Sequence, residues 1–493
     1  MSFSKRFGAM LLCGAAFAAL GAAQAQAAGT SNSAAADEIA QRLAALQQQI
    51  DDLNNTVADL KRSQSAQYVD LQAAQGKQDT FFTMKNGRPV FRTADGDFTL
   101  AIRALVQLDT AYYMQGFVPG SGVTQANTDF SSGTNFRRAR AGISGTLFKD
   151  WSYEFIYDFG GSGLEAATIA SAFIQYDGLG PVHIKVGAYP TPESFDDSTS
   201  AQDLLFLERA QPTDLARSIA GSDGREGATI FGYDDNYFAA LSYTGDLVGA
   251  ASEFDEQQAV VGRAAYRFAI APDVNLALGG DMTYVVKLPD LAAGPLPPDV
   301  LRLRERPELN VDDNSIRLID TGSINASHYW EYGLEGAGNW HNLYGQGGYF
   351  NYEVSRRAST LPDPSFDGWY LQASWVLTGE SKQYRPERGA YTTPTPDHPF
   401  SFSKGDWGAW EIAGRYSDLD LDYDPGLAGS ATPLAGIRGG EQRIWTGGLN
   451  WYPNADMRFM LNYQHTDVSR LSATGGSLDA KLDALSLRAQ FAL

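Results

Sequence analysis

The sequence is poor in cysteine, in histidine and in positive charge. It contains one cysteine, Cys13, and five histidines, and 38 lysine and arginine residues stand against 58 aspartate and glutamate residues, for a formal net charge of −20. A single cysteine cannot close an intramolecular disulfide, so the stability of the chain must come from packing and hydrogen bonds. The acidic balance argues against nucleic acid as a partner.

Long apolar runs are scarce too. The run from Phe7 to Leu20 follows Lys5 and Arg6 and precedes small residues that end near Ala27. This order is typical of a secretory signal peptide, which we expect to occupy residues 1–27. A retained membrane anchor is disfavoured because the run is short for a helical span of about 20 residues. No later stretch reaches that length, which excludes a helical membrane protein.

Motifs that carry chemistry are missing as well. The histidines stand singly, at positions His183, His328, His341, His398 and His465, and no Gly-x-Ser-x-Gly motif is present. Neither metal-ligand spacing nor a nucleophile with its base can be assembled from these residues. We therefore predict no catalytic residue, no metal site, no cofactor and no enzymatic activity.

A heptad pattern follows the predicted signal peptide. Apolar residues recur at spacings of four and three, namely at Ile39, Leu43, Leu46, Ile50, Leu53, Val57 and Leu60. So narrow a stripe is buried only against other copies, which predicts a coiled-coil stalk over residues 37–75. Ile50 and Val57 at one seam position favour a dimer in isolation, although a tethered domain could impose a trimer. A single helix lying on its own protein stays open as an alternative, because the seam spans only about three heptads.

From Phe98 almost to the C-terminus, polar and apolar residues alternate. The first stretch places Arg103, Gln107 and Asp109 on one face of a strand, opposite Ile102 and its apolar neighbours. The region is rich in glycine and aromatic residues and contains no convincing amphipathic helix. It therefore indicates an all-β domain of about 400 residues, which is larger than a single soluble sandwich.

The alternation predicts sixteen strands. They lie near residues 98–113, 136–148, 151–159, 167–177, 182–189, 226–233, 236–244, 259–269, 274–286, 328–337, 340–354, 367–378, 407–421, 441–452, 456–468 and 480–493. Tight turns alternate with longer connections such as 190–225 and 287–327, as in outer-membrane barrels. We therefore expect a 16-stranded antiparallel transmembrane β-barrel over residues 98–493, joined to the stalk by a linker over residues 76–97. Residues 379–406 are an exception, because this long segment falls where a short turn is due.

Basic residues that face the inside of such a barrel would decide which solutes pass. By parity the inward set is Arg103, Arg138, Arg140, Lys185, Arg263, Arg267, Arg415, Arg458 and Arg488, and the segment 190–225 adds Arg209 and Arg217. Guanidinium groups are always charged and bind oxyanions through several donors, so we predict that these residues line the pore and bind anions. The alternative is that they pair with inward carboxylates, such as Asp109 and Glu154, and brace the wall.

Several segments of the barrel region resemble one known family. They are "FRRARAGISG", "VHIKVGAYPTPESF", "LLFLER", "RERPEL", "GWYLQASWVLTGESKQY", "GAWEIAGRYSDLDL" and "GGLNWYPNADMRFMLNYQHTDV". In these segments the chain resembles the phosphate-selective porins O and P of Gram-negative outer membranes.

The resemblance implies a homotrimer of barrels in the outer membrane, surrounded by lipid and lipopolysaccharide, with the coiled coil in the periplasm. Each barrel would pass small anions passively, with phosphate or polyphosphate as the expected solute. It also implies that the segment 190–225, the next long loop and residues 379–406 enter the lumen.

One departure from the expected phosphate site concerns charge. The segment 190–225 carries the carboxylates Glu193, Asp196, Asp197, Asp203, Glu208, Asp214 and Asp223, three arginines and no lysine. This favours a weaker preference for phosphate and keeps a general porin for small organic solutes open. A trimeric surface protein is the other alternative, although an adhesin would carry its short barrel segment after a long passenger, and here the barrel fills most of the chain. A passive tether to peptidoglycan through the stalk is compatible with a pore.

Overall fold

The computed structural model describes residues 33–75, 80–85, 87–115, 130–161, 168–249, 255–290, 300–312 and 316–493. The predicted signal peptide, residues 1–27, lies outside the described residues. The chain divides into two units, Met1–Gln78 and Asp79–Leu493. None of the described helices combines the length and the apolarity needed to cross a membrane.

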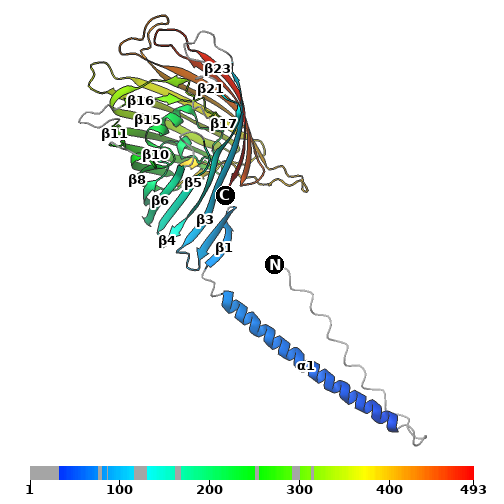
Figure 1. Ribbon diagram of the computed structural model, residues 1–493. Coiled ribbons are helices and arrows are strands. Elements are labelled where there is room, and N and C mark those ends of the chain that lie inside the picture. Colours follow the sequence, from blue (N-terminus) through cyan, green and yellow to red (C-terminus); the bar gives the residue numbers. More distant parts are fainter. Residues whose placement is uncertain are drawn as a thin grey trace. The chain divides into compact units, whose positions relative to one another are not determined.

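The described part of the first unit is one helix, α1 (Ser33–Gln75) (Figure 1). It includes the whole of the predicted stalk. From Leu43 to Leu60 the apolar heptad side chains are exposed: Leu43 is 62% exposed, Leu53 is 63% exposed and Leu60 is 58% exposed. A helix with such a stripe gains little stability alone, because helical stability in proteins comes mostly from packing of the apolar face. The helix is confirmed, and its self-association stays a prediction.

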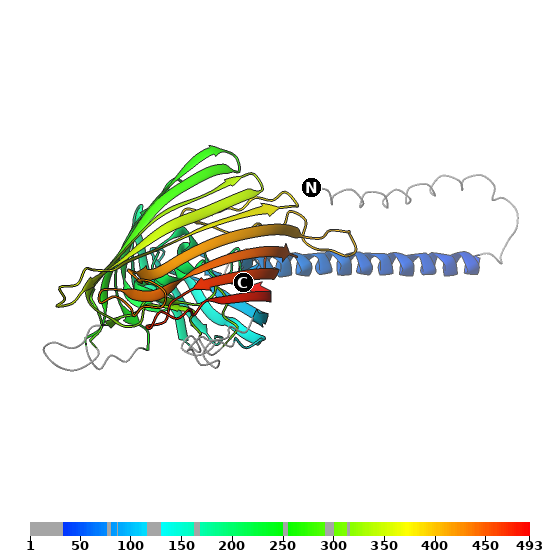
Figure 2. The same cartoon turned by 90° about the horizontal axis from the view of Figure 1, so that it is seen from above.

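The second unit is a closed barrel of sixteen antiparallel strands (Figures 1 and 2). In barrel order the strands are β3 (Thr99–Gln115), β4 (Gly133–Leu147), β5 (Trp151–Asp158), β6 (Thr168–Leu179), β7 (Val182–Ala188), β8 (Arg225–Tyr233), β9 (Tyr237–Leu247), β10 (Gln258–Ala271), β11 (Val274–Lys287), β15 (Ile324–Trp340), β16 (Leu343–Arg356), β17 (Ser365–Val376), β20 (Ala409–Tyr423), β21 (Ile437–Tyr452), β22 (Met457–Ser469) and β23 (Ala480–Ala492). Pairing of β23 with β3, with Arg488 opposite Asp109, closes the barrel. All sixteen predicted strands are present, with shifts of a few residues at their ends.

The predicted linker over residues 76–97 contains two strands that the sequence analysis does not predict. Strands β1 (Thr80–Lys85) and β2 (Arg88–Thr93) form a hairpin, and β2 pairs with the start of β3. The hairpin turn contains Gly87, with a φ of 76°. Glycine adopts this left-handed conformation without strain, and Asn-Gly between two short apolar runs is a strong hairpin signal.

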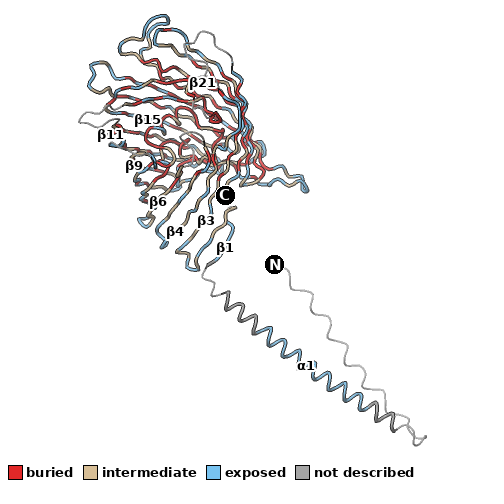
Figure 3. Tube along the Cα trace, viewed as in Figure 1, coloured by how far each residue is buried: buried red, intermediate tan, exposed pale blue. Residues whose placement is uncertain are grey.

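The two faces of the barrel wall have opposite polarity. Apolar side chains on the outer face are exposed, such as Ile102 at 40%, Leu371 at 60% and Leu334 at 69%, whereas Asp109 and Glu411 on the inner face are 0% exposed. Figure 3 shows the buried residues gathered inside the barrel. An apolar exterior around a polar interior is the pattern of a barrel that sits in lipid.

A β-bulge interrupts β4 and changes which arginines face inward. In the β3–β4 register Arg138 lies opposite Gln107, and the next pair is Leu108 with Phe136, so Arg137 is the extra residue. A bulge places two residues opposite one and shifts the alternation. As a consequence Arg137 and Arg138 both make contacts on the inner side of the wall.

Three long connections fold into the barrel. The segment 189–224 carries α2 (Phe195–Ser198) and α3 (Gln211–Ala220), the segment 288–323 carries β12 (Val300–Leu301), β13 (Arg304–Glu305) and β14 (Ile319–Asp320), and the segment 377–408 carries β18 (Tyr384–Arg385) and β19 (Ala390–Tyr391). Helix α3 contacts β9, β10 and β11 as well as β16, β17 and β20. Its apolar residues Leu215 and Ile219 join Leu303 and Leu309 of the second segment in one core cluster. The segment 377–408 is the unusual stretch that the sequence places at the short-turn rim.

Candidate functional site

The segment 189–224 is held across the lumen by arginines of the wall. Three of them donate to main-chain carbonyl groups of this segment: Arg415 to Glu208 at 3.0 Å, Arg458 to Leu204 and Leu205 at 2.5 and 3.2 Å, and Arg488 to Leu207 at 2.7 Å. Wall amides complete the set: Gln107 donates to Ala201, Gln490 to Gln202 and Asn450 to Leu205. A buried carbonyl without a donor is costly, so these side chains permit an irregular segment to lie inside the barrel.

Arg263 joins two of the inserted segments. Its guanidinium donates to the Ser198 hydroxyl at 2.8 Å and to the carbonyl groups of Arg388 and Gly389 at 3.0 and 2.7 Å. The same group stacks over the ring of Phe195, 4.8 Å from its centroid. Arg263 therefore fixes α2 and the segment 377–408 to β10, and most of its donors are used by the protein itself.

The arginines of β4 are also engaged. Arg138 donates to the Gln107 side chain at 2.9 Å, and Arg140 pairs with Asp158 at 2.7 Å and with Asp223. The bulge residue Arg137 pairs with Glu208 at 2.7 Å. All three arginines face the lumen and contact polar groups of the wall or of the inserted segment.

Glu208 is the carboxylate on which several of these arginines converge. It lies 2.7 Å from Arg137 and 3.3 Å from Arg488, whose guanidinium also binds both oxygens of Asp109 at 2.6 Å. Burial alone would raise the pKa of Glu208, but Arg137, Arg138 and Arg488 outweigh it and hold the pKa well below the usual range of a glutamate. Glu208 is therefore a permanent negative charge in the lumen.

The two arginines predicted within the segment 190–225 are held inside it. Arg209 donates to the carbonyl groups of Asp196 and Thr199, and Arg217 pairs with Asp197 at 2.6 Å. Burial would lower the pKa of Arg217, but Asp197, Asp223 and Asp214 raise it above its usual value. The acidity that the sequence shows in this segment is thus partly neutralised within the segment and by Arg140.

A second group of cations has no such partner. Among the described residues, no hydrogen bond or ion pair involves the side chains of Arg88, Arg103, Lys185, Arg267 and Arg388. Lys185 lies over the ring of Phe173, 4.5 Å from its centroid, and Arg267 lies 5.0 Å from the centroid of Tyr384. Arg88, Arg103 and Lys185 each lie within electrostatic range of Arg388 and of Glu154. We call these five residues the open cations.

The open cations share one end of the barrel. Arg103 is near the start of β3, Lys185 follows the turn before β7, and Arg267 precedes the turn after β10, so all three lie toward the short-turn rim. Arg88 is on the β1–β2 hairpin, and Arg388 enters on the segment 377–408. The structure therefore divides the predicted set: Arg103, Lys185 and Arg267 are open, and the other members hold the inserted segments or the wall.

The sequence analysis does not predict three of the cations that the structure places at the candidate site. Arg137 was assigned no inward role because nothing in the sequence locates the bulge. Arg88 lies in the predicted linker, although the pair Asn86-Gly87 is a hairpin signal. Arg388 lies in the segment 379–406, whose unexpected length was the available signal.

A small polar cavity lies where the segments 189–224 and 288–323 meet β4. Its volume is about 30 Å³, and the described residues around it are Arg137, Glu208, Arg209, Gln211, Asp214, Arg217, Glu305, Arg306, Glu308 and Asn310. Four arginines face four carboxylates, so the cavity carries little net charge. Burial, reinforced by Asp214, raises the pKa of Glu305 to about 8. At neutral pH Glu305 is therefore mostly protonated, which shifts the balance toward positive charge.

A cluster of buried carboxylates lies between α2 and the wall strands β11 and β15. Glu193 and Glu331 are each 1% exposed, and Asp197 and Asp281 lie nearby. Neither carboxyl oxygen of Glu193 has a hydrogen-bond partner among the described residues. Burial, and then Asp197, raise the pKa of Glu193 well above its usual value. No group of three such residues in the described part of the chain has the geometry of a metal site.

Replacing Arg458 tests the anchoring of the segment 189–224. We expect Arg458→Met to lower the free energy of unfolding by roughly 3 kcal/mol, because two buried carbonyl groups lose a charged donor. The loosened segment should also make single-channel currents noisier and larger. Heat-modifiability in detergent and planar-bilayer recording would measure both effects. Arg443→Met is the matched control, because Arg443 lies on the outer face and pairs with Glu441. Equal stability and conductance in the two variants would contradict the anchoring role.

The pKa of Glu305 predicts a pH-dependent selectivity. Below pH 8 the carboxyl is mostly neutral, and above it the group adds a negative charge beside Asp214. We expect the preference for anions, measured as the reversal potential in a potassium chloride gradient, to fall as pH rises from 7 to 9. In the Glu305→Gln variant the anion preference should fall less between pH 7 and pH 9, because this side chain can no longer become negatively charged. An unchanged pH profile in the variant would show that Glu305 does not titrate in this range.

This chain is similar in sequence to known porins. The chain is 25% identical to Porin O of Pseudomonas aeruginosa over 432 residues, which cover 84% of this chain and 92% of that protein. It is 26% identical to an uncharacterized protein of Caulobacter vibrioides over 386 residues, which cover 76% of this chain and 70% of that protein.

Solved structures with a related shape include an anion-selective porin from Comamonas acidovorans, with a TM-score of 0.48, 12% identity and coverage of 80% of this chain and 100% of that one. The outer membrane channel DcaP of Acinetobacter baumannii has a TM-score of 0.45, 9% identity and coverage of 82% and 99%. The profile of the phosphate-selective porin O and P family matches residues 110–493, and the chain belongs to this family of outer-membrane porins.

Proposed function

We propose that this porin prefers small anions and that the open cations set the preference. The observation that carries the proposal is the contrast between the two groups of arginines. The donors of Arg415, Arg458 and Arg488 face carbonyl or carboxylate oxygens of the protein, whereas Arg88, Arg103, Lys185, Arg267 and Arg388 have no such acceptor among the described residues. A cation that no protein acceptor satisfies attracts a mobile anion from water.

Phosphate is the solute that the family and Porin O support, and guanidinium groups suit its oxygens. Binding should be weak, because the constriction segment contributes balanced charge and Glu154 lies among the open cations. Movement through such a pore is passive and follows the concentration gradient of the solute.

The charge-balanced cavity favours a second candidate function. The lining of four arginines and four carboxylates, with Glu305 mostly protonated, leaves this region only slightly positive, so a pore that runs beside it would pass small organic solutes with little preference of sign. The two functions differ in the reversal potential in a potassium chloride gradient, which is anion-signed for the first and close to zero for the second.

The assembly and orientation are further parts of the proposal. Three copies associate, with the exposed seam of α1 packed against the seams of the other copies. The short-turn rim and α1 face the periplasm, and the long-loop rim faces the cell exterior, as the rule for outer-membrane barrels requires. The apolar outer face contacts lipid, and the exterior rim contacts lipopolysaccharide.

Substituting two open cations tests the proposed origin of selectivity. Arg103→Gln combined with Lys185→Met should lower the ratio of anion to cation permeability by roughly tenfold, the change that about 1.4 kcal/mol of electrostatic free energy produces. The control is Arg443→Gln on the outer face. Phosphate added to the same bilayers should block the chloride current of the unsubstituted protein more strongly than that of the double variant. Equal permeability ratios in all three proteins would place selectivity elsewhere.

Cysteine substitution in α1 tests the association of the stalk. Leu53→Cys places a thiol on the heptad seam, and Gln48→Cys places one on the far side of the same helix. We expect oxidation to link chains of the full-length Leu53→Cys variant several times faster than chains of the Gln48→Cys variant. Equal rates of linkage would mean that α1 does not self-associate through the seam.

A further inference from the structure

A large cavity lies at the long-loop end of the barrel, far along the strands from the open cations. Its volume is about 960 Å³, and its described lining comes from residues 320–325, 356–361, 432–438 and 470–478. These stretches belong to four different connections of the long-loop rim. A volume of this size is at the upper end of the range for small-molecule sites.

The charge of the cavity wall is positive. Arg356, Arg357, Arg438 and Arg470 line it, and Asp320 is the one carboxylate among the described lining residues. Asp320 is already paired with Arg302, a residue that does not line the cavity. Arg302 Nε lies 2.8 Å from a carboxyl oxygen of Asp320. The described lining therefore contains more cationic than anionic side chains.

The guanidinium groups are held in place and keep donors free. Arg470 donates to the carbonyl groups of Arg438, Leu318 and Asp320 at 3.3, 3.1 and 2.8 Å. Arg356 donates to two carbonyl groups, of Pro362 and Ala435, at 2.7 Å each. Each guanidinium has five N–H donors, so two remain on Arg470 and three on Arg356. Fixed donors lose little entropy when an oxyanion binds.

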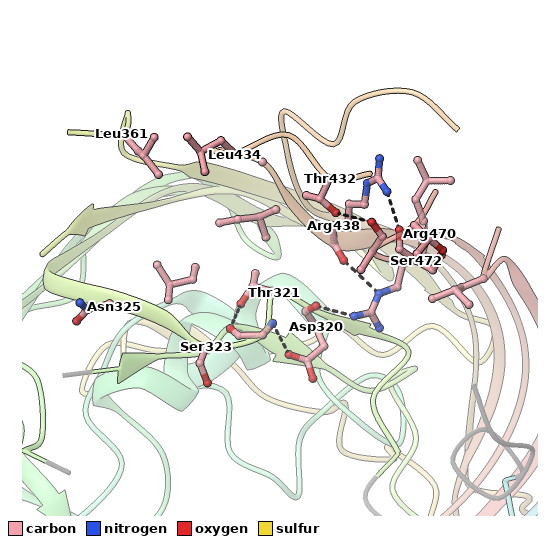
Figure 4. Close-up of a pocket in the computed structure, with 18 of the residues that line it drawn as sticks. Asp320, Thr321, Ser323, Asn325, Leu361, Thr432, Leu434, Arg438, Arg470 and Ser472 are labelled. Carbon is pink, nitrogen blue, oxygen red and sulfur yellow. Dashed lines mark hydrogen bonds between the residues drawn. The ribbon is translucent and has the colours of Figure 1, made fainter. Parts of the chain in front are cut away.

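Two leucine side chains form another edge of the cavity. Leu434 is 88% exposed, and Leu361 lies beside it at the upper edge in Figure 4, across an open space from Thr321 and Ser323. Arg438 and Arg470 occupy one side of the same space. Covering an exposed leucine with an apolar group of a ligand gains the free energy of burying its side chain. An anion that carries an apolar body would contact both sides at once.

We propose that this cavity captures organic anions that combine a carboxylate, or a related oxyanion, with an apolar body such as an aromatic ring. The oxyanion binds the free donors of Arg356 and Arg470, and the apolar body lies against Leu434 and Leu361. The proposal rests on the proposed function, because a capture site at the exterior rim serves a pore that passes anions. It narrows the solute class from any small anion to organic anions.

The experiment is block of single-channel current by three probes added to the long-loop side. Benzoate carries both features, acetate carries the carboxylate without the ring, and benzamide carries the ring without the charge. We expect benzoate to act at concentrations about tenfold lower than either of the others. Equal potency of benzoate and acetate, or of benzoate and benzamide, would overturn the proposal.

A pair of leucine variants supplies the structural control. Leu434→Ser removes an apolar contact from the cavity and disturbs little packing, because this side chain is almost fully exposed. Leu427→Ser is the matched change, since Leu427 is 79% exposed in the same connection and does not line the cavity. We expect the first variant to weaken the benzoate block several-fold and the acetate block not at all, and the second to change neither. Equal effects of the two variants would overturn the proposal.

The reversal potential in potassium chloride alone separates this proposal from the proposed function. A cation-signed or zero reversal potential would contradict the proposed anion preference of the pore, whatever the result with benzoate. An anion-signed potential combined with equal potency of the three probes would keep the anion pore and remove the capture site.

Discussion

The hydrogen bonds from wall arginines to the main-chain carbonyl groups of residues 204–208 are the interaction on which the rest of the lumen depends. An irregular segment inside a barrel carries peptide groups that water cannot fully reach, and each buried carbonyl needs a donor. Arg415, Arg458 and Arg488 supply charged donors from β20, β22 and β23, and β21 lies between the first two of these strands. With this segment fixed, α3 can pack against residues of the segment 288–323 inside the barrel.

Arginines that donate to protein carbonyl groups have a structural role, and they differ from the cations that remain available to bind a solute. A guanidinium whose donors face carbonyl oxygens, or that shares a carboxylate as Arg137 and Arg488 share Glu208, adds little net attraction for a passing anion. The cations that remain open lie toward the short-turn rim, and the long-loop rim has its own arginines around the large cavity. We infer that the pore has basic regions toward both rims of the barrel and a nearly charge-balanced region between them.

The strands could be predicted from the sequence because the alternation of polar and apolar residues directly reflects which side faces lipid. The hairpin at residues 80–93 was missed because its strands are six residues each, too short for alternation to stand out. The role of Arg458 could not be predicted, because its acceptors are carbonyl groups, which every residue carries. The bulge at Arg137 likewise depends on the register of two strands, which parity within one strand does not reveal.

The most direct test of this division of the arginines is to locate bound anions. A crystal structure of the full-length protein soaked in bromide would mark anion sites by anomalous scattering. The account predicts bromide peaks beside Arg103, Lys185 and Arg388, and none beside Arg415, Arg458 or Arg488. Peaks at the second group, with the first group empty, would contradict it.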